Sequence, residues 1–190
     1  MRLLSVNTGR VQPLQMQGRR ILSAIGKQAA PGAVHVGTMG LVGDEQADPT
    51  VHGGPAKAVY AYPVEHLPFW KAHRSEAGVS LFDEDLPPGY MGENLSIEGL
   101  TEHAVWIGDE LHFPGCVLRV TAPRELQRGA GADHAGTQDQ YIGGHLRAAW
   151  PAQSRCAAVT VTSSRAPGAS RPATTVVRTG SGSRKCTRYS

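Results

Sequence analysis

Turn-forming residues interrupt most of the chain roughly every eight to twelve residues, and this spacing limits each regular element to a short strand or a short helix. Glycine and proline mark the turns around three extended runs, Arg2–Asn7, Gly18–Ile25 and Ala33–Val36. Short strands at such a spacing are typical of an antiparallel barrel or sandwich. We therefore predict a mainly β protein in which these three runs are strands.

Residues 37–66 hold the densest cluster of turn-forming and chemically useful side chains. Gly53 and Gly54 permit backbone conformations that other residues avoid, so a turn here can bring its own amides close to a ligand. His52 stands immediately before them and has two interpretations: it donates to a ligand oxygen, or it is tied into the turn. Residues 57–62 follow as a predicted strand that supports this turn.

Polar side chains near this turn allow more than one role. Asp44, Glu45, Asp48 and His52 include the ligand types that bind a divalent cation. The interpretation that we favour is that the acids cap turns and pair with nearby arginines. Lys27 lies at the end of a predicted strand, where its cation either reaches an anionic ligand or remains a solvated surface charge.

Residues 63–73 begin with proline and carry apolar residues at helical spacing, so they predict a helix, which Pro68 makes bent or two-part. In residues 92–100 a turn delivers Asn94 into a strand. The Asn94 amide has a donor and an acceptor, which suit reading a heterocycle edge or capping a turn. Residues 101–124 predict three short strands.

Cysteine and apolar residues restrict the class of protein. Cys116, Cys156 and Cys186 have wide spacings that match no zinc pattern, and their odd number argues against a disulfide framework. We interpret Cys116 as a small buried filler of a strand. No apolar run reaches the roughly 18 residues of a membrane span, and the first residues do not resemble a signal peptide. We therefore expect a cytoplasmic protein that has no membrane partner.

The net charge of +3 is unevenly distributed along the chain. Residues 1–124 hold 10 Lys/Arg against 13 Asp/Glu, whereas residues 125–190 hold 9 against 3. A basic segment can bind nucleic acid, but this one has neither interleaved aromatic residues nor a helical stripe of cations. We therefore regard nucleic acid as an unlikely partner.

Several short motifs follow one another between residues 43 and 124: Gly43-Asp-Glu-Gln-Ala-Asp48, His52-Gly-Gly-Pro55, Lys57-Ala-Val-Tyr-Ala-Tyr-Pro-Val-Glu-His66, Gly92-Glu-Asn-Leu95, Ile107-Gly-Asp109 and Pro123-Arg124. In order and spacing they resemble the MOSC domain family, named for the C-terminal part of molybdenum cofactor sulfurases. The similarity is to its YiiM-like, N-hydroxylaminopurine-resistance branch and covers about residues 3–124.

This resemblance implies a MOSC-type β-barrel with a short helical segment over residues 1–125. It also implies binding of the molybdenum cofactor, with a cysteine thiolate as the protein ligand of the metal. The expected partners are a small N-hydroxylated substrate, such as an N-hydroxylated purine, and a redox protein that supplies electrons. By motif position, the resemblance assigns cofactor binding to Lys27, His52, Lys57, Asn94 and Arg124.

The sequence departs from the family pattern at two places. Ala56 stands where the family has Asp, next to Lys57. After Pro123-Arg124 the family continues with Pro and the metal-binding Cys within three residues, but this chain continues with Glu-Leu-Gln. Neither Cys116 nor Cys156 lies at the required place in the sequence. The metal ligand that the family uses is therefore missing.

Residues 126–190 match no part of the family pattern. Residues 125–190 contain 14 Ser/Thr and 11 Ala but no Phe or Met and only 2 Leu, a composition that opposes formation of a packed core. We therefore expect an irregular or disordered tail, in which residues 159–162 and 174–177 have only local strand propensity.

We interpret the tail as a shifted reading frame, because Leu126-Gln127 can be encoded CTG-CAG, which contains the cysteine codon TGC one base over. A genuine divergent extension is the alternative, and sequencing the gene through codons 120–135 distinguishes the two.

Two functions remain open at this point. One is a molybdenum-dependent reductase that is impaired by loss of its cysteine ligand. The other is a non-catalytic binding module for an anionic cofactor or heterocycle. Whether the chain is an enzyme therefore depends on whether a cysteine is present to bind the metal.

Overall fold

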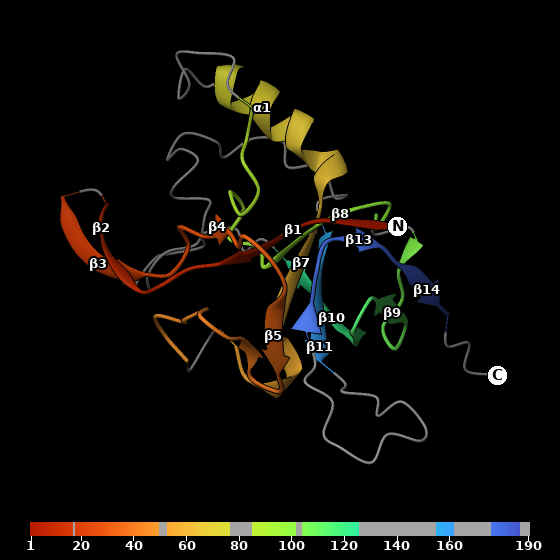
Figure 1. Ribbon diagram of the computed structural model, residues 1–190. Helices are drawn as coiled ribbons and strands as arrows, with labels where there is room; N and C mark the ends of the chain where they lie inside the picture. Colours follow the sequence, from red (N-terminus) through yellow and green to blue (C-terminus); the bar gives the residue numbers. More distant parts are fainter. Residues whose placement is uncertain are drawn as a thin grey trace.

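Figure 1 shows the computed structural model, which describes residues 1–16, 18–49, 53–76, 85–101, 104–125, 155–161 and 176–186. Within these residues, nine strands form one sheet in the order β13-β1-β8-β7-β11-β10-β9-β14, with β4 also paired to β1. Its strands are β1 (Arg2–Thr8), β4 (Gln28–Ala29), β7 (Val59–Pro63), β8 (Leu95–Glu98), β9 (Glu110–Phe113), β10 (Cys116–Glu125), β11 (Arg155–Val161), β13 (Gly180–Ser181) and β14 (Ser183–Lys185).

The sheet closes on itself. Its two end strands, β13 and β14, are separated in the chain by Gly182 alone, and they pair with β1 and β9 respectively. The described neighbours in the sheet are antiparallel except for β7 and β8, which are parallel. Closure removes the exposed sheet edges. The architecture is the MOSC-type β-barrel predicted from the sequence.

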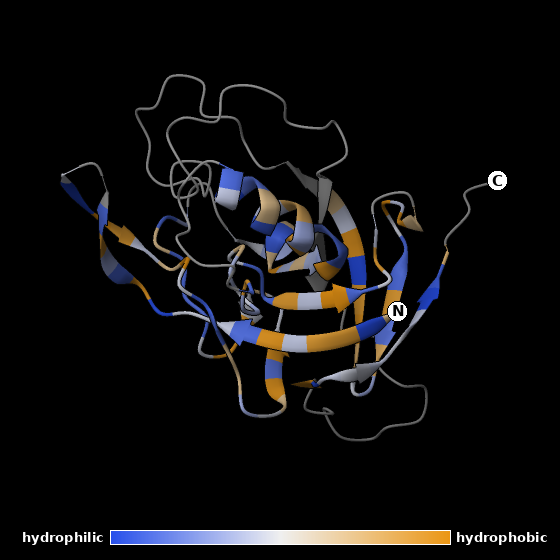
Figure 2. Cartoon of the chain, turned by 90° about the horizontal axis from the view of Figure 1, so that it is seen from above, coloured by the Kyte–Doolittle hydropathy of each residue, from blue (hydrophilic) through white to orange (hydrophobic). Residues whose placement is uncertain are grey.

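Strand β7 is buried along both of its faces, because two apolar clusters cover it. Val59 and Ala61 belong to the cluster inside the barrel. Tyr60 and Tyr62 point the other way, as the two-residue period of a strand requires, and pack with Trp70. Trp70 lies on helix α1 (Leu67–Glu76), and its Nε1 donates to the Tyr62 hydroxyl at 2.6 Å. The helix therefore covers this part of the barrel (Figures 1 and 2).

The predicted two-part helix is confirmed. A 3-10 turn, η2 (Val64–His66), leads directly into α1, and Pro68 lies in the first turn of α1, where a missing amide hydrogen costs nothing. In the described part of the chain, no helix is long and apolar enough to cross a membrane.

Two small sheets stand beside the barrel. One contains β12 (Val176–Val177), β5 (Val34–Gly37) and β6 (Gly40–Leu41), and its buried valines extend the barrel core. The other is a hairpin of β2 (Gln12–Met16) and β3 (Arg19–Ser23). The strands predicted over Arg2–Asn7, Gly18–Ile25 and Ala33–Val36 are thus confirmed as β1, β3 and β5.

Two strand predictions need correction. Lys57 is not in a strand: it ends the 3-10 turn η1 (Pro55–Lys57), and β7 begins at Val59. The described part of residues 101–124 contains two strands, β9 and β10, instead of three. The chain turns at Trp106 and Ile107, which are 70% and 61% exposed, because the buried Asp109 carboxylate accepts a hydrogen bond from the Trp106 amide.

The prediction of an irregular tail does not hold for the described residues beyond 125. Strand β11 lies between β7 and β10, so it joins the two halves of the barrel sheet. Strands β12, β13 and β14 also pair with strands formed by residues 1–125. Composition misled the prediction because a strand gains its backbone hydrogen bonds from its neighbours even where its own side chains are small.

We expect that Gly182→Ala destabilises the protein by about 1–3 kcal/mol, because a Cβ there would lie 2.8 Å from the backbone oxygen of His112 and 2.7 Å from the Phe113 ring. Gly26→Ala is the control, since its Cβ meets no atom within 4 Å and the backbone φ is not positive. Urea denaturation of both variants measures the difference. Equal stability of the two variants would show that the end strands do not close the barrel.

Candidate functional site

A buried ion pair forms the centre of the candidate site. The Lys27 ammonium contacts Asp44 Oδ1, and the two side chains are only 9% and 6% exposed. The same oxygen accepts the Gly9 amide hydrogen at 2.8 Å, and Asp44 Oδ2 accepts from Asn94 Nδ2 at 2.8 Å. Two of the predicted cofactor residues, Lys27 and Asn94, therefore meet at one carboxylate.

The Asn94 amide is fully engaged inside the barrel. Its Oδ1 accepts the Tyr60 amide hydrogen at 3.0 Å, and its Nδ2 also donates to the Asn7 carbonyl at 3.2 Å. Its backbone amide donates to Tyr60 O, and its carbonyl accepts from Asn7 N. Asn94 thus joins β1, β7 and the start of β8, which is the turn-and-strand role that the sequence left open.

A second polar network lies next to this centre. The Glu93 carboxylate is fully buried and accepts three hydrogen bonds: from Gly89 N at 2.8 Å, Met91 N at 3.0 Å and Ser96 Oγ at 2.6 Å. Burial raises the pKa of Glu93, although these three donors oppose the shift. Asn7 links the networks, because its Nδ2 donates to Ser96 Oγ at 3.0 Å.

The acids of the motif around Asp44 act on turns, as we favoured. Glu45 accepts the Val11 amide hydrogen at 2.7 Å, and its own amide donates to Gly9 O at 2.8 Å. The partner of Asp44 is a lysine, however, and not an arginine. No group of three or more His, Cys, Asp or Glu residues that could hold a metal ion occurs among the described residues.

The remaining predicted cofactor residues lie elsewhere or outside the described residues. Lys57 is exposed at the end of η1. The Thr121 hydroxyl, on β10, donates a hydrogen bond to Ala56 O at 2.8 Å and so connects η1 to the barrel. Gly54, which precedes η1, has a φ of 79°, so the predicted glycine turn is present. His52 lies outside the described residues.

Arg124 is placed by its backbone in β10, where its register partner in β11 is Cys156. This proximity could not be read from the sequence, because 31 residues separate the two positions.

Cys116 is buried in the barrel core, as predicted, and burial raises the pKa of its thiol to about 11. Cys116 therefore remains a protonated thiol at neutral pH, whereas Cys186 is exposed near the end of the described chain.

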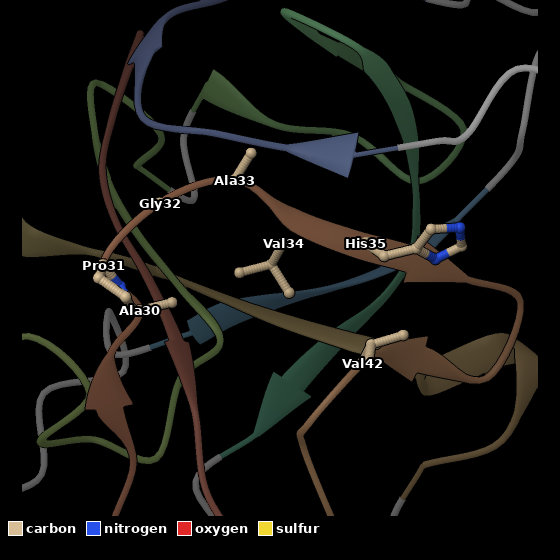
Figure 3. A pocket seen from close by; sticks show the side chains of 7 residues that line it. All are labelled: Ala30, Pro31, Gly32, Ala33, Val34, His35 and Val42. Atoms are coloured by element: carbon tan, nitrogen blue, oxygen red, sulfur yellow. The ribbon is translucent and has the colours of Figure 1, made fainter.

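A shallow open pocket of about 420 Å³ lies beside β5 (Figure 3). It is lined mostly by small apolar residues, with His35 as its one imidazole. None of the predicted cofactor residues lines it. The pocket is therefore separate from the candidate site, which is the closed polar centre around Asp44.

Residues that the sequence left unassigned complete this centre: Asn7, Gly9 and Glu93. The signal for the first two was the turn that glycine marks after the predicted strand Arg2–Asn7, which was interpreted only as the end of that strand. A Cβ at Gly9 would lie 2.9 Å from Ala24 O and 3.1 Å from Lys27 Cγ, so this close approach requires glycine.

A model of the MOSC domain matches residues 48–141. Protein YflK of Bacillus subtilis, which is uncharacterized, is 41% identical over 123 residues, or 65% of this chain and 52% of YflK. Protein YiiM of Escherichia coli is 39% identical over 121 residues, or 64% of this chain and 50% of YiiM. A protein of Gibberella moniliformis named "Reductase" is 37% identical over 123 residues, 21% of its length.

The fold is also found in a solved structure. YiiM from Geobacillus stearothermophilus superposes with a TM-score of 0.58 at 20% identity, over 94% of this chain and 72% of that chain. The chain spans about half the length of the curated relatives YflK and YiiM that it matches. With the motifs, the barrel and these relatives in agreement, the chain contains a segment that matches the MOSC domain and is similar to proteins of the YiiM type.

Proposed function

We propose that this chain derives from a molybdenum-cofactor reductase of N-hydroxylated purines and related compounds, and that its present form lacks the metal-anchoring thiolate and has little reductase activity. The match to the MOSC domain and the relative named "Reductase" support the reaction class. The missing cysteine after Pro123-Arg124 supports the impairment.

The missing cysteine is the observation that carries the impairment, and Cys116 does not replace it, because Cys116 is buried in the apolar core of the barrel. A thiolate is the form of cysteine that binds metals, and a thiol with a pKa of about 11 is protonated at neutral pH. Lys27 and Asn94 also have their polar groups committed to Asp44 and the backbone. The described residues therefore do not fit the metal of the cofactor, and we derive no catalytic step through it.

Cys156 is the thiol that most directly tests this proposal. It is the register partner of Arg124, the last residue of the family motif that this chain retains. Metal bound through Cys156 would mean that the chain has replaced the lost ligand from a neighbouring strand. The experiment therefore includes its removal.

Restoring a cysteine after Arg124 is expected to restore metal binding. The Leu126→Cys and Gln127→Cys variants, expressed in a host that makes the molybdenum cofactor, should bind molybdenum and reduce an N-hydroxylated purine. The unmodified chain and the matched Leu126→Ser and Gln127→Ser variants should do neither. Metal analysis and a reductase assay measure the two properties.

Two outcomes contradict the proposal. Stoichiometric molybdenum together with reductase activity in the unmodified chain would show that a ligand is present. Loss of both properties in Cys156→Ser would then identify that ligand. Failure of both cysteine variants to bind metal would contradict the reductase assignment. The binding-module alternative gains no support from the Asp44 centre, because the Lys27 cation is already neutralised there.

A further inference from the structure

The β2–β3 hairpin projects from the barrel as a separate arm (Figures 1 and 2). Its two strands form a sheet of their own, and within the described residues they pair only with each other. An isolated two-stranded hairpin has little intrinsic stability in water. The arm therefore offers two unpaired strand edges and a surface that contributes little to the barrel core.

The arm has a local excess of basic charge, whereas the charges of the rest of the chain balance. Residues 10–23 contain three arginines and no Asp/Glu, whereas the rest of the chain contains 16 Lys/Arg and 16 Asp/Glu. Arg10, Arg19 and Arg20 are exposed on the arm and at its base. Their side chains form no ion pair with any residue that the structure describes. Leu22 lies in β3 of the same arm, and its side chain is 61% exposed.

The Asp44 centre holds the base of the arm. Asp44 Oδ1 accepts from Gly9 N, which precedes β2, and contacts Lys27, which follows β3. Glu45 adds a second contact through Val11 N at 2.7 Å. One carboxylate thus connects both legs of the arm to the residues that the family motif assigns to the cofactor.

The chemistry of the arm favours an acidic protein as its partner. Single-stranded nucleic acid is bound by cations together with aromatic residues on which bases stack, and this chain has no Phe, Tyr or Trp before Tyr60. Membrane-surface elements need several exposed apolar side chains, and Leu22 is the one large apolar residue of the described arm that is exposed at this level. Opposite charge steers an acidic protein to the arm, and the balanced charge of the rest of the chain offers it no net attraction.

We propose that the β2–β3 arm is the docking surface for an acidic electron-carrier protein, with Arg10, Arg19 and Arg20 as its cationic contacts. The identity of the partner as an electron carrier rests on the proposed function. The acidity of the partner rests on the charges of the arm alone.

Binding of two acidic carriers, a plant-type [2Fe–2S] ferredoxin and a flavodoxin, tests this proposal with the full chain at low and high salt. We expect Arg19→Gln/Arg20→Gln to weaken binding roughly three- to tenfold at low salt, and high salt to weaken the wild type. Arg19→Lys/Arg20→Lys should bind like the wild type. The control, Arg2→Gln/Arg119→Gln, removes the same charge from arginines paired with Glu98 and Glu110 and should change binding less than about twofold.

Three results would overturn the proposal. Neither carrier binds, the arm variant binds as tightly as the control, or a single-stranded DNA oligonucleotide or phosphatidylglycerol vesicles bind more tightly than both carriers. Circular dichroism and urea denaturation establish that each variant is folded. The binding assay needs neither molybdenum nor turnover, so docking can succeed when cysteine restoration fails, and cysteine restoration can succeed when docking fails. The failure of one proposal is therefore distinguishable from the failure of the other.

Discussion

We expect the Asp44→Ala variant to lose about 3–5 kcal/mol of its free energy of unfolding, because it leaves a buried ammonium without its counter-charge. Lys27 is only 9% exposed at the side chain, so water cannot replace the carboxylate without a structural opening. The change also removes the acceptor of Gly9 N and Asn94 Nδ2. Urea denaturation at neutral pH measures the loss.

An exposed pair of the same chemistry supplies the control. Lys71 contacts Asp85 at 2.8 Å, but the Asp85 side chain is 96% exposed, and exposed pairs contribute little to stability. Asp85→Ala should therefore leave stability nearly unchanged. Adding Lys27→Met to Asp44→Ala should recover part of the loss, because the unpaired charge is then gone. A loss for Asp44→Ala no larger than that for Asp85→Ala would contradict the buried-pair assignment.

The fold was predictable where local signals agree with long-range pairing. Turn spacing predicted short strands, and β1, β3 and β5 formed where it placed them. The third strand expected within residues 101–124 failed because the Asp109 side chain holds a turn at Trp106, which periodicity does not register. The role of β11 was hidden because its small residues pair with strands far away in the sequence.

The site was predictable by residue but not by contact. The motif selected Lys27 and Asn94, and both do meet at Asp44. The family resemblance assigned both to the cofactor, while the residues alone left open a surface role for Lys27 and a turn-capping role for Asn94. Their shared carboxylate is revealed only when β1 pairs with β4 and β8. Glu93 was quoted only as part of a motif, since nothing in a single sequence separates a buried glutamate from an exposed one.

The pH dependence of stability reveals the state of Glu93. Burial raises the pKa of this carboxyl above its ordinary value of 4.5, so the folded protein binds its proton more tightly than the unfolded chain does. The resulting stabilisation is fully present below pH 4.5 and is lost as the pH rises through the raised folded pKa. Glu93→Gln should remove this component, which urea midpoints across the acidic range measure against the wild type.

Glu93→Ala should cost about 3 kcal/mol or more at neutral pH, because it leaves Gly89 N, Met91 N and Ser96 Oγ without their buried acceptor. Glutamine keeps one acceptor oxygen and should cost less than alanine. Glu98→Ala, on the exposed end of β8, is the matched control and should be nearly neutral. If Glu93→Ala were as stable as that control, the Glu93 carboxylate would not hold residues 89–91 against the barrel. The buried position from which its raised pKa was inferred would then be wrong.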